Sequence, residues 1–275
     1  MNYTGANPAT KAIAIIPARY KSTRLPGKPL LPIVGRPLVL WVVERALAAR
    51  HVARAIVATD DRRILEAVTH AGFEARMTGS DHASGTDRVA EVAHSLPDAE
   101  IIVNVQGDEP LISPQTIDRA IEALTETDTG KVEIATTCEP ISDRADVSNP
   151  AVVKVVIDEN GRALYFSRAP IPYQHEAVRR HGSLEAALEN EEDLLACFRK
   201  HTGLYVYRRD FLLKYTSWPQ SALERAEGLE QLRALEHGAT IKVVAAASRS
   251  IGVDTIEDLE RVRAIMESEV TMTAR

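Results

Sequence analysis

Residues 12–30 of this 275-residue chain read AIAIIPARYKSTRLPGKPL, a short apolar run followed directly by a basic segment. The isoleucine-rich start, residues 12–16, predicts a buried strand. Pro17 cannot donate a ladder hydrogen bond, so the chain is expected to leave the sheet there. The cations that follow suit a triphosphate, because Arg is a planar fork and Lys a point charge. They are Arg19, Lys21, Arg24 and Lys28, with Gly27 allowing close backbone approach. A solvated basic loop is the alternative.

Composition narrows the class of protein. The length fits one large or two modest domains. A formal net charge of −6 argues against a nucleic-acid partner, whose binding usually needs a basic surface. Cys138 and Cys197 lie far apart without metal-ligand spacing, so they predict neither a disulfide nor a zinc site and fit a reducing cytoplasm. No apolar run is long enough to span a bilayer and no signal peptide is evident, so we expect a cytoplasmic protein without a membrane partner.

Short apolar runs alternate with segments of helical period, which predicts an α/β fold with helices on the faces of a sheet. The expected strands are residues 12–16, 54–59, 100–105, 134–138, 204–207 and 241–246. One helix is expected to begin near Pro37, and three others are expected at residues 61–71, 114–124 and 255–266. Residues 152–157 and 164–167 predict a hairpin across the DENG turn at 158–161. Residues 173–200 are polar and acidic, and they predict a mobile helical insertion.

Two aspartates follow predicted strands. Residues 101–110 read IIVNVQGDEP, which places Asp108 just after a strand, where ligands of open α/β sheets bind. There it could join Mg²⁺ to phosphate oxygens, although Asp and Gly before Pro also suit a plain turn. Asp254 lies between the last strand and the last helix, so it is a second possible metal ligand or a carboxylate that stabilises the helix dipole.

A small polar loop precedes another predicted helix. Residues 81–88 read DHASGTDR. Free amides at such a helix start can hold phosphate or contact a nucleobase. A simple capping loop is the equal alternative.

These motifs, in this order, resemble the 3-deoxy-D-manno-octulosonate (Kdo) cytidylyltransferases, the CMP-Kdo synthetases of lipopolysaccharide assembly. The resemblance runs from about residue 12 to residue 266. It includes PAR with STRLPGK at 17–28, HASGTDR at 82–88, NVQGDEP at 104–110, YFSRAPIP at 165–172, HTGLY at 201–205, LEQLR at 229–233 and GVD at 252–254.

The resemblance implies transfer of CMP from CTP to the anomeric hydroxyl of Kdo, with release of pyrophosphate. It assigns catalysis to Arg19, Arg24, Lys28, Asp108 and Asp254, with Mg²⁺ on Asp108 and Asp254. Nucleotide binding falls to Arg19, Ser22, Arg24, Lys28, Ser84, Gly85, Thr86, Arg88, Gln106 and Asp108. Sugar binding falls to Arg168, which suits a carboxylate, and to His201, Tyr205, Glu230 and Gln231.

The fold implied by the resemblance is a three-layer α/β/α nucleotidyltransferase-like domain with a mainly parallel, mixed sheet. Residues 12–151 and 236–270 would form the nucleotide-binding domain, residues 152–235 a smaller sugar-binding region that forms a homodimer, and residues 1–11 a flexible extension. Two rival functions stay open. One is cytidylyl transfer to another acid, such as 8-amino-Kdo or a sialic acid, and the other is a nucleotide-binding protein without catalysis.

Overall fold

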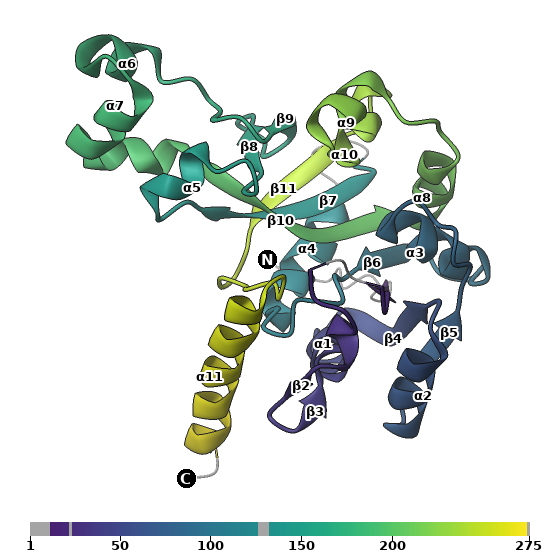
Figure 1. The fold of residues 1–275 in the computed structure, drawn as a ribbon. Coiled ribbons are helices and arrows are strands. Elements are labelled where there is room, and N and C mark those ends of the chain that lie inside the picture. The colour runs from purple at the N-terminus through teal and green to yellow at the C-terminus, as the bar shows by residue number, and fades with distance from the viewer. Residues whose placement is uncertain (1–11, 22–23, 126–131, 274–275) are drawn as a thin grey trace, which may run out of the picture. The chain divides into compact units, whose positions relative to one another are not determined.

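The computed structural model describes residues 12–21, 24–125 and 132–273 (Figure 1). The predicted extension at residues 1–11 lies outside them. Contacts divide the chain into two compact units. The first unit holds residues up to Ile121, Leu204–Ser217 and the chain from Ala247 onward, and the second holds Glu122–Gly203 and Trp218–Ala246. Contacts alone define these two units. The predicted division into a nucleotide-binding domain and a sugar-binding region, with limits at residues 152 and 235, therefore stays a prediction.

The first unit carries the strands β1 (Ala12–Ala18), β2 (Pro32–Ile33), β3 (Arg36–Pro37), β4 (Val52–Thr59), β5 (Glu74–Met77) and β6 (Ile101–Asn104), and the end of β10 (Arg199–Arg208). Its helices are η1 (Lys28–Leu30), α1 (Leu38–Leu47), α2 (Arg62–His70), α3 (Gly85–His94), most of α4 (Pro114–Thr125), α8 (Arg209–Thr216) and α11 (Ile256–Thr273).

Strand β1 is central in this unit. It pairs in parallel with β4 on one side and β6 on the other, β5 extends the parallel order beyond β4, and β10 pairs with β6 in antiparallel orientation. All of β1 except Pro17 is buried, as an apolar run enclosed by neighbours on both sides requires. The carboxyl ends of β1 and β6 therefore open at the same edge, the usual place for a ligand.

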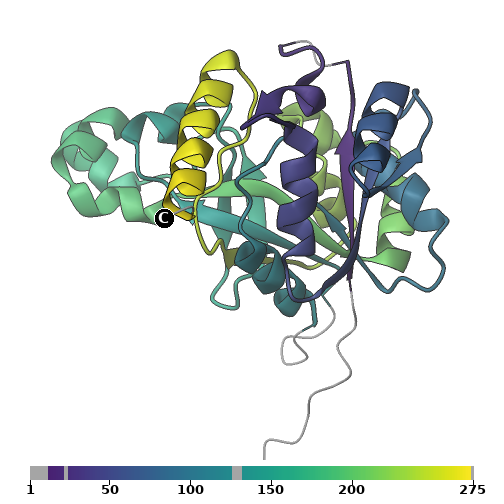
Figure 2. The same cartoon turned by 90° about the horizontal axis from the view of Figure 1, so that it is seen from below.

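Helices cover this sheet on both faces. Right-handed connections from β1 to β4 and from β4 to β5 place α1 and α2 on one face, and the return through α3 to β6 places α3 on the other. In Figure 1, α3 and α8 lie across the strands from α1 and α2. Figure 2 shows α11 beside α1, where Arg45 pairs with Glu269 at 2.9 Å.

The second unit carries the strands β7 (Ile134–Pro140), β8 (Lys154–Ile157), β9 (Ala163–Ser167), β11 (Ile241–Ala245) and the start of β10. Its helices are α5 (Arg144–Ser148), α6 (His175–His181), α7 (Leu184–Asn190), η2 (Glu192–Cys197), α9 (Ala222–Glu227) and α10 (Gln231–Glu236). Strands β11 and β7 pair in parallel, and β8 and β9 form an antiparallel hairpin.

The segment 173–200 packs in a hydrophobic cluster that it shares with residues 141–152. Residues of α6, α7 and η2 pack with others from β7 to β8 in one cluster: Ile141, Val147, Val152, Ala177, Ala187, Leu188, Leu194 and Phe198. The predicted helical character of the insertion is therefore confirmed, and its mobility stays a prediction. Phe198 is fully buried in this cluster and joins the helices to the start of β10.

The predicted α/β fold with a mixed, mainly parallel sheet flanked by helices is confirmed, and the hairpin turns at Gly161, whose φ is 71°. Several predicted strand limits were wrong. Strand β4 begins at Val52 rather than residue 54, β7 ends at Pro140 rather than residue 138, and β8 begins at Lys154 rather than residue 152. Strand β10 begins at Arg199 rather than residue 204, because Lys200 pairs with Lys154 of β8 and this tertiary partner outweighs the polar sequence. Strand β1 runs on to Ala18. The backbone nitrogen of Pro17 faces the β6 side of the strand. The pairing of β1 with β6 already ends at Ile15 and Asn104, so the missing N–H of Pro17 costs no hydrogen bond between strands.

Loss of the Phe198 ring should destabilise the protein markedly. We expect Phe198→Ala to lower the free energy of unfolding by about 3–5 kcal/mol, because the buried ring would leave a cavity among the helices. Urea unfolding followed by circular dichroism measures this change. Leu164→Ala is the matched control, since Leu164 is 63% exposed, and its effect should stay within about 0.5 kcal/mol. Equal effects in the two variants would contradict the role of the cluster.

Candidate active site

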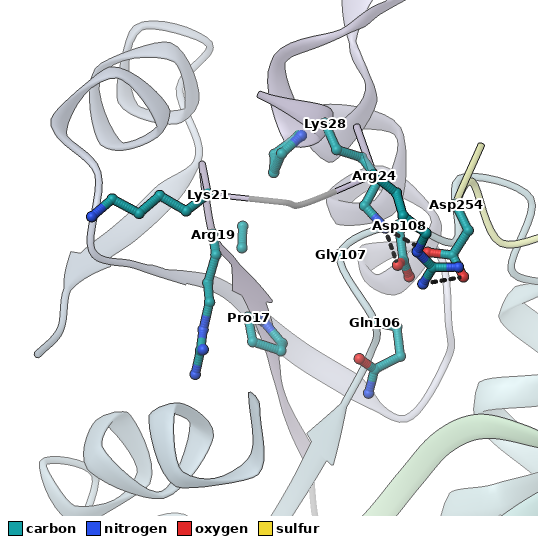
Figure 3. Close-up of a pocket in the computed structure, with 11 residues that line it drawn as sticks. Pro17, Arg19, Lys21, Arg24, Lys28, Gln106, Gly107, Asp108 and Asp254 are labelled. Atoms are coloured by element: carbon teal, nitrogen blue, oxygen red, sulfur yellow. Dashed lines mark hydrogen bonds and ion pairs between the residues drawn. The ribbon is translucent and has the colours of Figure 1, made fainter. Parts of the chain in front are cut away.

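A pocket of about 380 Å³ lies in the first unit, at the carboxyl ends of β1 and β6 (Figure 3). Basic side chains, two carboxylates and an amide line it, together with backbone of both strand ends. The lining residues are Pro17, Ala18, Arg19, Lys21, Arg24, Lys28, Pro29, Gln106, Gly107, Asp108 and Asp254. The pocket thus brings together all five residues predicted to be catalytic, as well as Gln106.

Close contact between two backbone segments shapes the floor of the pocket. A Cβ atom on Gly107 would lie 2.5 Å from the carbonyl oxygen of Pro17, closer than real Cβ contacts allow. The loop after β6 can therefore approach the end of β1 only with glycine at this position. This approach sets where Asp108, the next residue, enters the pocket.

One backbone hydrogen bond brings Asp254 to Asp108. The amide of Val253 donates to the carbonyl of Asp108 at 2.9 Å. The chain then turns into α11, where the Asp258 carboxylate accepts from the amides of Asp254 and Thr255, and the Asp258 amide donates to the Thr255 hydroxyl. Thr255 thus caps the start of this helix. The helix start is satisfied by Asp258, which leaves the Asp254 carboxylate turned toward the pocket (Figure 3).

Lys28 lies between the two carboxylates. Its Nζ donates to Asp108 Oδ2 at 2.6 Å and to Asp254 Oδ1 at 3.1 Å, while Arg24 Nη2 lies 3.2 Å from Asp254 Oδ2. Burial by itself would lower the pKa of Lys28, but Asp108 and Asp254 outweigh it and the pKa is raised above its ordinary value. The ammonium is therefore charged at neutral pH. Gly27, with φ 71°, starts the short helix η1 that carries Lys28.

The donor set fits a hard divalent cation that also binds phosphate. Asp108 and Asp254 already converge on one positive charge, and both offer carboxylate oxygens, the ligands that Mg²⁺ prefers. Within residues 12–21, 24–125 and 132–273, no group of three or more His, Cys, Asp or Glu side chains could hold a metal ion. A cation here would need further oxygens from a substrate, as Mg²⁺ commonly does with phosphates.

Arg19 connects the pocket to the loop before α3. Its Nη2 donates to the carbonyls of His82 and Ser84, each at 2.8 Å. Arg19 therefore holds the HASGTDR segment as well as lining the pocket, a link that its position in the sequence does not reveal.

The residues predicted to surround the nucleotide from α3 have clear structural roles. Ser84 caps the helix in a reciprocal capping box with Asp87, and Gly85 starts it against Pro17. Thr86 is 7% exposed. Arg88 is fully buried, pairs with Asp60 at 3.0 Å and donates to Thr78. In this arrangement Arg88 can act on a nucleotide only by fixing the loop around it. Ser22 lies outside the described residues.

The sugar-side predictions fall mainly in the second unit. Arg168 donates from its guanidinium to the carbonyls of Glu227 (2.7 Å), Pro150 (2.8 Å) and Gly228 (3.4 Å), using three of its five N–H donors. Glu230 and Gln231 follow these carbonyls closely in the chain, at the start of α10. His201 packs edge-to-face on Phe166, two residues before Arg168. Four of the five predicted sugar residues thus belong to the second unit, and Tyr205 belongs to the first.

His201 is held as a neutral imidazole. Its Nε2 lies 2.9 Å from Thr136 Oγ1, and its amide donates to the carbonyl of Val153. Burial lowers the pKa of His201 to about 3, because removal of water disfavours the charged ring. It is therefore a hydrogen-bonding group rather than a cation at neutral pH.

Sequence reasoning missed the aromatic support of the basic loop. The Arg63 guanidinium lies 3.3 Å from the centre of the Tyr20 ring, and a Cβ on Gly27 would meet that ring at 3.2 Å. The Gly27 amide also donates to the Tyr20 carbonyl at 3.0 Å. Arg63 stands on α2, far from the loop in sequence, so no local pattern could have indicated this cation–π contact.

The close approach at Gly107 generates a sharp test. We expect Gly107→Ala to lower the free energy of unfolding by about 1–3 kcal/mol, since the added methyl group would press on the Pro17 carbonyl. Chemical denaturation measures the change. Gly252→Ala is the control, because its Cβ would meet only Glu109 Cγ at 3.9 Å. If both variants were as stable as the parent, the approach would not constrain the pocket.

The lowered pKa of His201 predicts a pH dependence of stability. Its pKa rises to about 6.5 on unfolding, so its contribution is complete above pH 6.5 and is lost as the pH falls toward 3. Relative to His201→Gln, the parent protein should lose about 1.5 kcal/mol of unfolding free energy between pH 6.5 and pH 5. Unfolding curves at the two pH values measure the difference. Parallel pH profiles would show that His201 is not buried in neutral form.

Comparison with known proteins places the chain in a family. A cytidylyltransferase family model matches residues 13–242. The 3-deoxy-manno-octulosonate cytidylyltransferase of Geobacter sulfurreducens is 53% identical over 252 residues, which cover 90% of this chain and 96% of the relative. The enzyme of the same name from Trichlorobacter lovleyi is 49% identical over 258 residues, covering 93% of this chain and 98% of the relative.

A solved structure agrees with these relatives. The structure of a CMP:2-keto-3-deoxy-manno-octonic acid synthetase complexed with CTP matches with a TM-score of 0.83 and 45% identity, covering 94% of this chain and 99% of that one. The likeness therefore extends over nearly the whole length of both chains and is far above the level that shows a fold alone. The chain belongs to the cytidylyltransferase family and groups within it with the 3-deoxy-manno-octulosonate cytidylyltransferases.

Proposed function

We propose that this protein transfers CMP from CTP to the anomeric hydroxyl of Kdo, forming CMP-Kdo and pyrophosphate for lipopolysaccharide synthesis. The observation that carries the proposal is the pair Asp108 and Asp254 converging on one cation inside a basic pocket at the strand ends. A binding module has no need for two carboxylates beside an anion. The names of relatives about half identical over nearly their full length support the substrates.

The residues of the pocket divide the work by charge. Lys28, Arg24, Arg19 and Lys21 would hold the triphosphate and offset the charge that develops on the leaving pyrophosphate. The sugar oxygen forms a bond to the α-phosphorus, the bond from that phosphorus to the pyrophosphate oxygen breaks, and the hydroxyl proton passes to solvent. Asp108 and Asp254 would hold Mg²⁺, which when bound supplies a Lewis acid that orients the hydroxyl and lowers its pKa.

The remaining residues would position the two substrates. Ser84, Gly85 and Thr86 at the start of α3, with Arg88 behind them and Gln106 in the pocket, would surround the nucleotide. On the sugar side, the two N–H donors that Arg168 keeps beyond its carbonyl bonds suit a carboxylate. His201, Tyr205, Glu230 and Gln231 would bond the sugar hydroxyls.

The proposal also includes the setting of the enzyme. Among residues 12–21, 24–125 and 132–273, no helix has the length and apolar character needed to cross a bilayer. We place the enzyme in the cytoplasm, where CTP is available, and expect a homodimer formed through residues 152–235. Both expectations rest on the family resemblance.

Pyrophosphate release tests the proposed function directly. The purified protein is incubated with CTP and Mg²⁺ and with Kdo, 8-amino-Kdo or a sialic acid at equal concentrations. We expect Kdo to give the fastest release. Preference for another acid would keep the reaction class and reassign the sugar pocket. No release with any acid would favour a nucleotide-binding protein without catalysis.

Asp108→Asn should remove most of the turnover. We expect kcat at saturating Mg²⁺ to fall by about 100-fold or more, because a neutral amide cannot replace the carboxylate charge beside the reacting groups. The pyrophosphate assay measures kcat, and circular dichroism checks the fold. Asp98→Asn, which changes an exposed carboxylate outside the pocket, should leave kcat unchanged. Full turnover in Asp108→Asn would remove Asp108 from the metal role.

Arg168→Ala should act on the sugar rather than on the nucleotide. We expect the KM for the sugar acid to rise about tenfold while the KM for CTP changes little, because a charge-assisted contact to the carboxylate is lost. Initial rates with each substrate varied in turn separate the two constants. A rise confined to the KM for CTP would refute the carboxylate assignment.

A further inference from the structure

The Lys28 ammonium lies between the two carboxylates that would hold a metal ion. It is the one group that touches both Asp108, at 2.6 Å, and Asp254, at 3.1 Å, among the ion pairs of the described residues (Figure 3). The Lys28 side chain is only 14% exposed, so the contact is partly shielded from water. A metal ion cannot bind both carboxylates while the ammonium keeps its present position, because the two cations would repel each other and occupy the same space.

The charges of this cluster are balanced without any metal. Two carboxylates face two cations, Lys28 and Arg24, whose Nη2 lies 3.2 Å from Asp254 Oδ2. A divalent cation approaching from solvent therefore meets little net attraction and a repelling ammonium. The two anionic groups alone would attract it strongly.

A triphosphate changes this balance. Lys28 and Arg24 line the same pocket as Arg19 and Lys21, so anionic phosphates entering it would compete with the carboxylates for both side chains. The lysine stem has four flexible carbons and can carry its charge to a new partner without movement of the backbone. Asp108 and Asp254 would then be released together.

We propose that Lys28 keeps divalent metal out of the carboxylate pair until the nucleotide arrives, and that the triphosphate draws Lys28 away and opens the site. This inference rests on the proposed function, because it assumes that Asp108 and Asp254 hold the metal. Its consequence is positive coupling: CTP strengthens metal binding, and by linkage the metal strengthens CTP binding by the same factor. Lys28 thereby sets the order in which substrate and metal enter.

Direct binding of Mn²⁺ to the nucleotide-free protein tests this exchange, in which a metal ion replaces the Lys28 ammonium at the two carboxylates. Free Mn²⁺ is followed by electron paramagnetic resonance as protein is titrated, with no CTP present. We expect Lys28→Met to bind Mn²⁺ about tenfold or more tightly than the parent, since it removes the ammonium that contacts both carboxylates. Lys28→Arg keeps a cation between them and should bind Mn²⁺ as weakly as the parent.

Two variants separate exchange from a general effect of charge. Lys21→Met removes a cation from the same pocket that takes part in no ion pair with Asp108 or Asp254 among those of the described residues. It should change Mn²⁺ affinity by about twofold at most. Adding Asp254→Asn to Lys28→Met should abolish the gain. Circular dichroism confirms that each variant folds, and Lys28→Gln replaces Lys28→Met if the latter does not.

The outcomes are decisive. Equal Mn²⁺ affinity in the parent and Lys28→Met, or an equal gain in Lys21→Met, would overturn the exchange. Failure of Asp254→Asn to remove the gain would place the Mn²⁺ elsewhere and overturn it too. The pyrophosphate assay on the parent protein stands apart from these titrations. Turnover without the expected Mn²⁺ affinities would refute the inference and leave the proposed function intact. The expected Mn²⁺ affinities without turnover would support the inference and refute the proposed function.

Discussion

The shared contact of Lys28 with Asp108 and Asp254 is the interaction on which the pocket depends. Like charges as close as these two carboxylates repel strongly unless a cation lies between them. The fold brings them together nonetheless, because the Val253 amide is bonded to the Asp108 carbonyl and Gly107 lets the loop lie against Pro17. The backbone geometry of the pocket therefore holds two carboxylates close together, and a cation must offset their repulsion.

The region around Arg168 in the second unit is ordered by a different set of contacts. Lys154 is fully buried and donates to three carbonyls, those of Asn149, Val152 and Arg168. Burial lowers its pKa, and no carboxylate bonds it among the hydrogen bonds of the described residues. Glu227 accepts from the Ser167 hydroxyl and the Arg168 amide. The backbone at Arg168 is thus held on both sides, so its side chain starts from a defined position.

Much of the fold could be predicted from the sequence because the signals are local. The isoleucine run of β1 is buried on both faces, and the turn at Gly161 needs a positive φ. The limits of β10 could not be predicted, since Arg199 and Lys200 are polar and form strand only by pairing with β8. The strands β2 and β3 have two residues each and are too short to show a period, and β5 has the sequence EARM, which is not an apolar run.

The sequence by itself determined the α/β class, the basic loop after β1 and the two aspartates after strands, because each depends on residue type and on neighbours in the chain. Only the tertiary structure decided what those residues do to one another. It placed Lys28 between the aspartates, turned Arg19 toward the carbonyls before α3 and buried Arg88 against Asp60. These contacts join segments distant in the chain, and pairing of charges across such distances follows from the packing of strands and helices rather than from any local pattern.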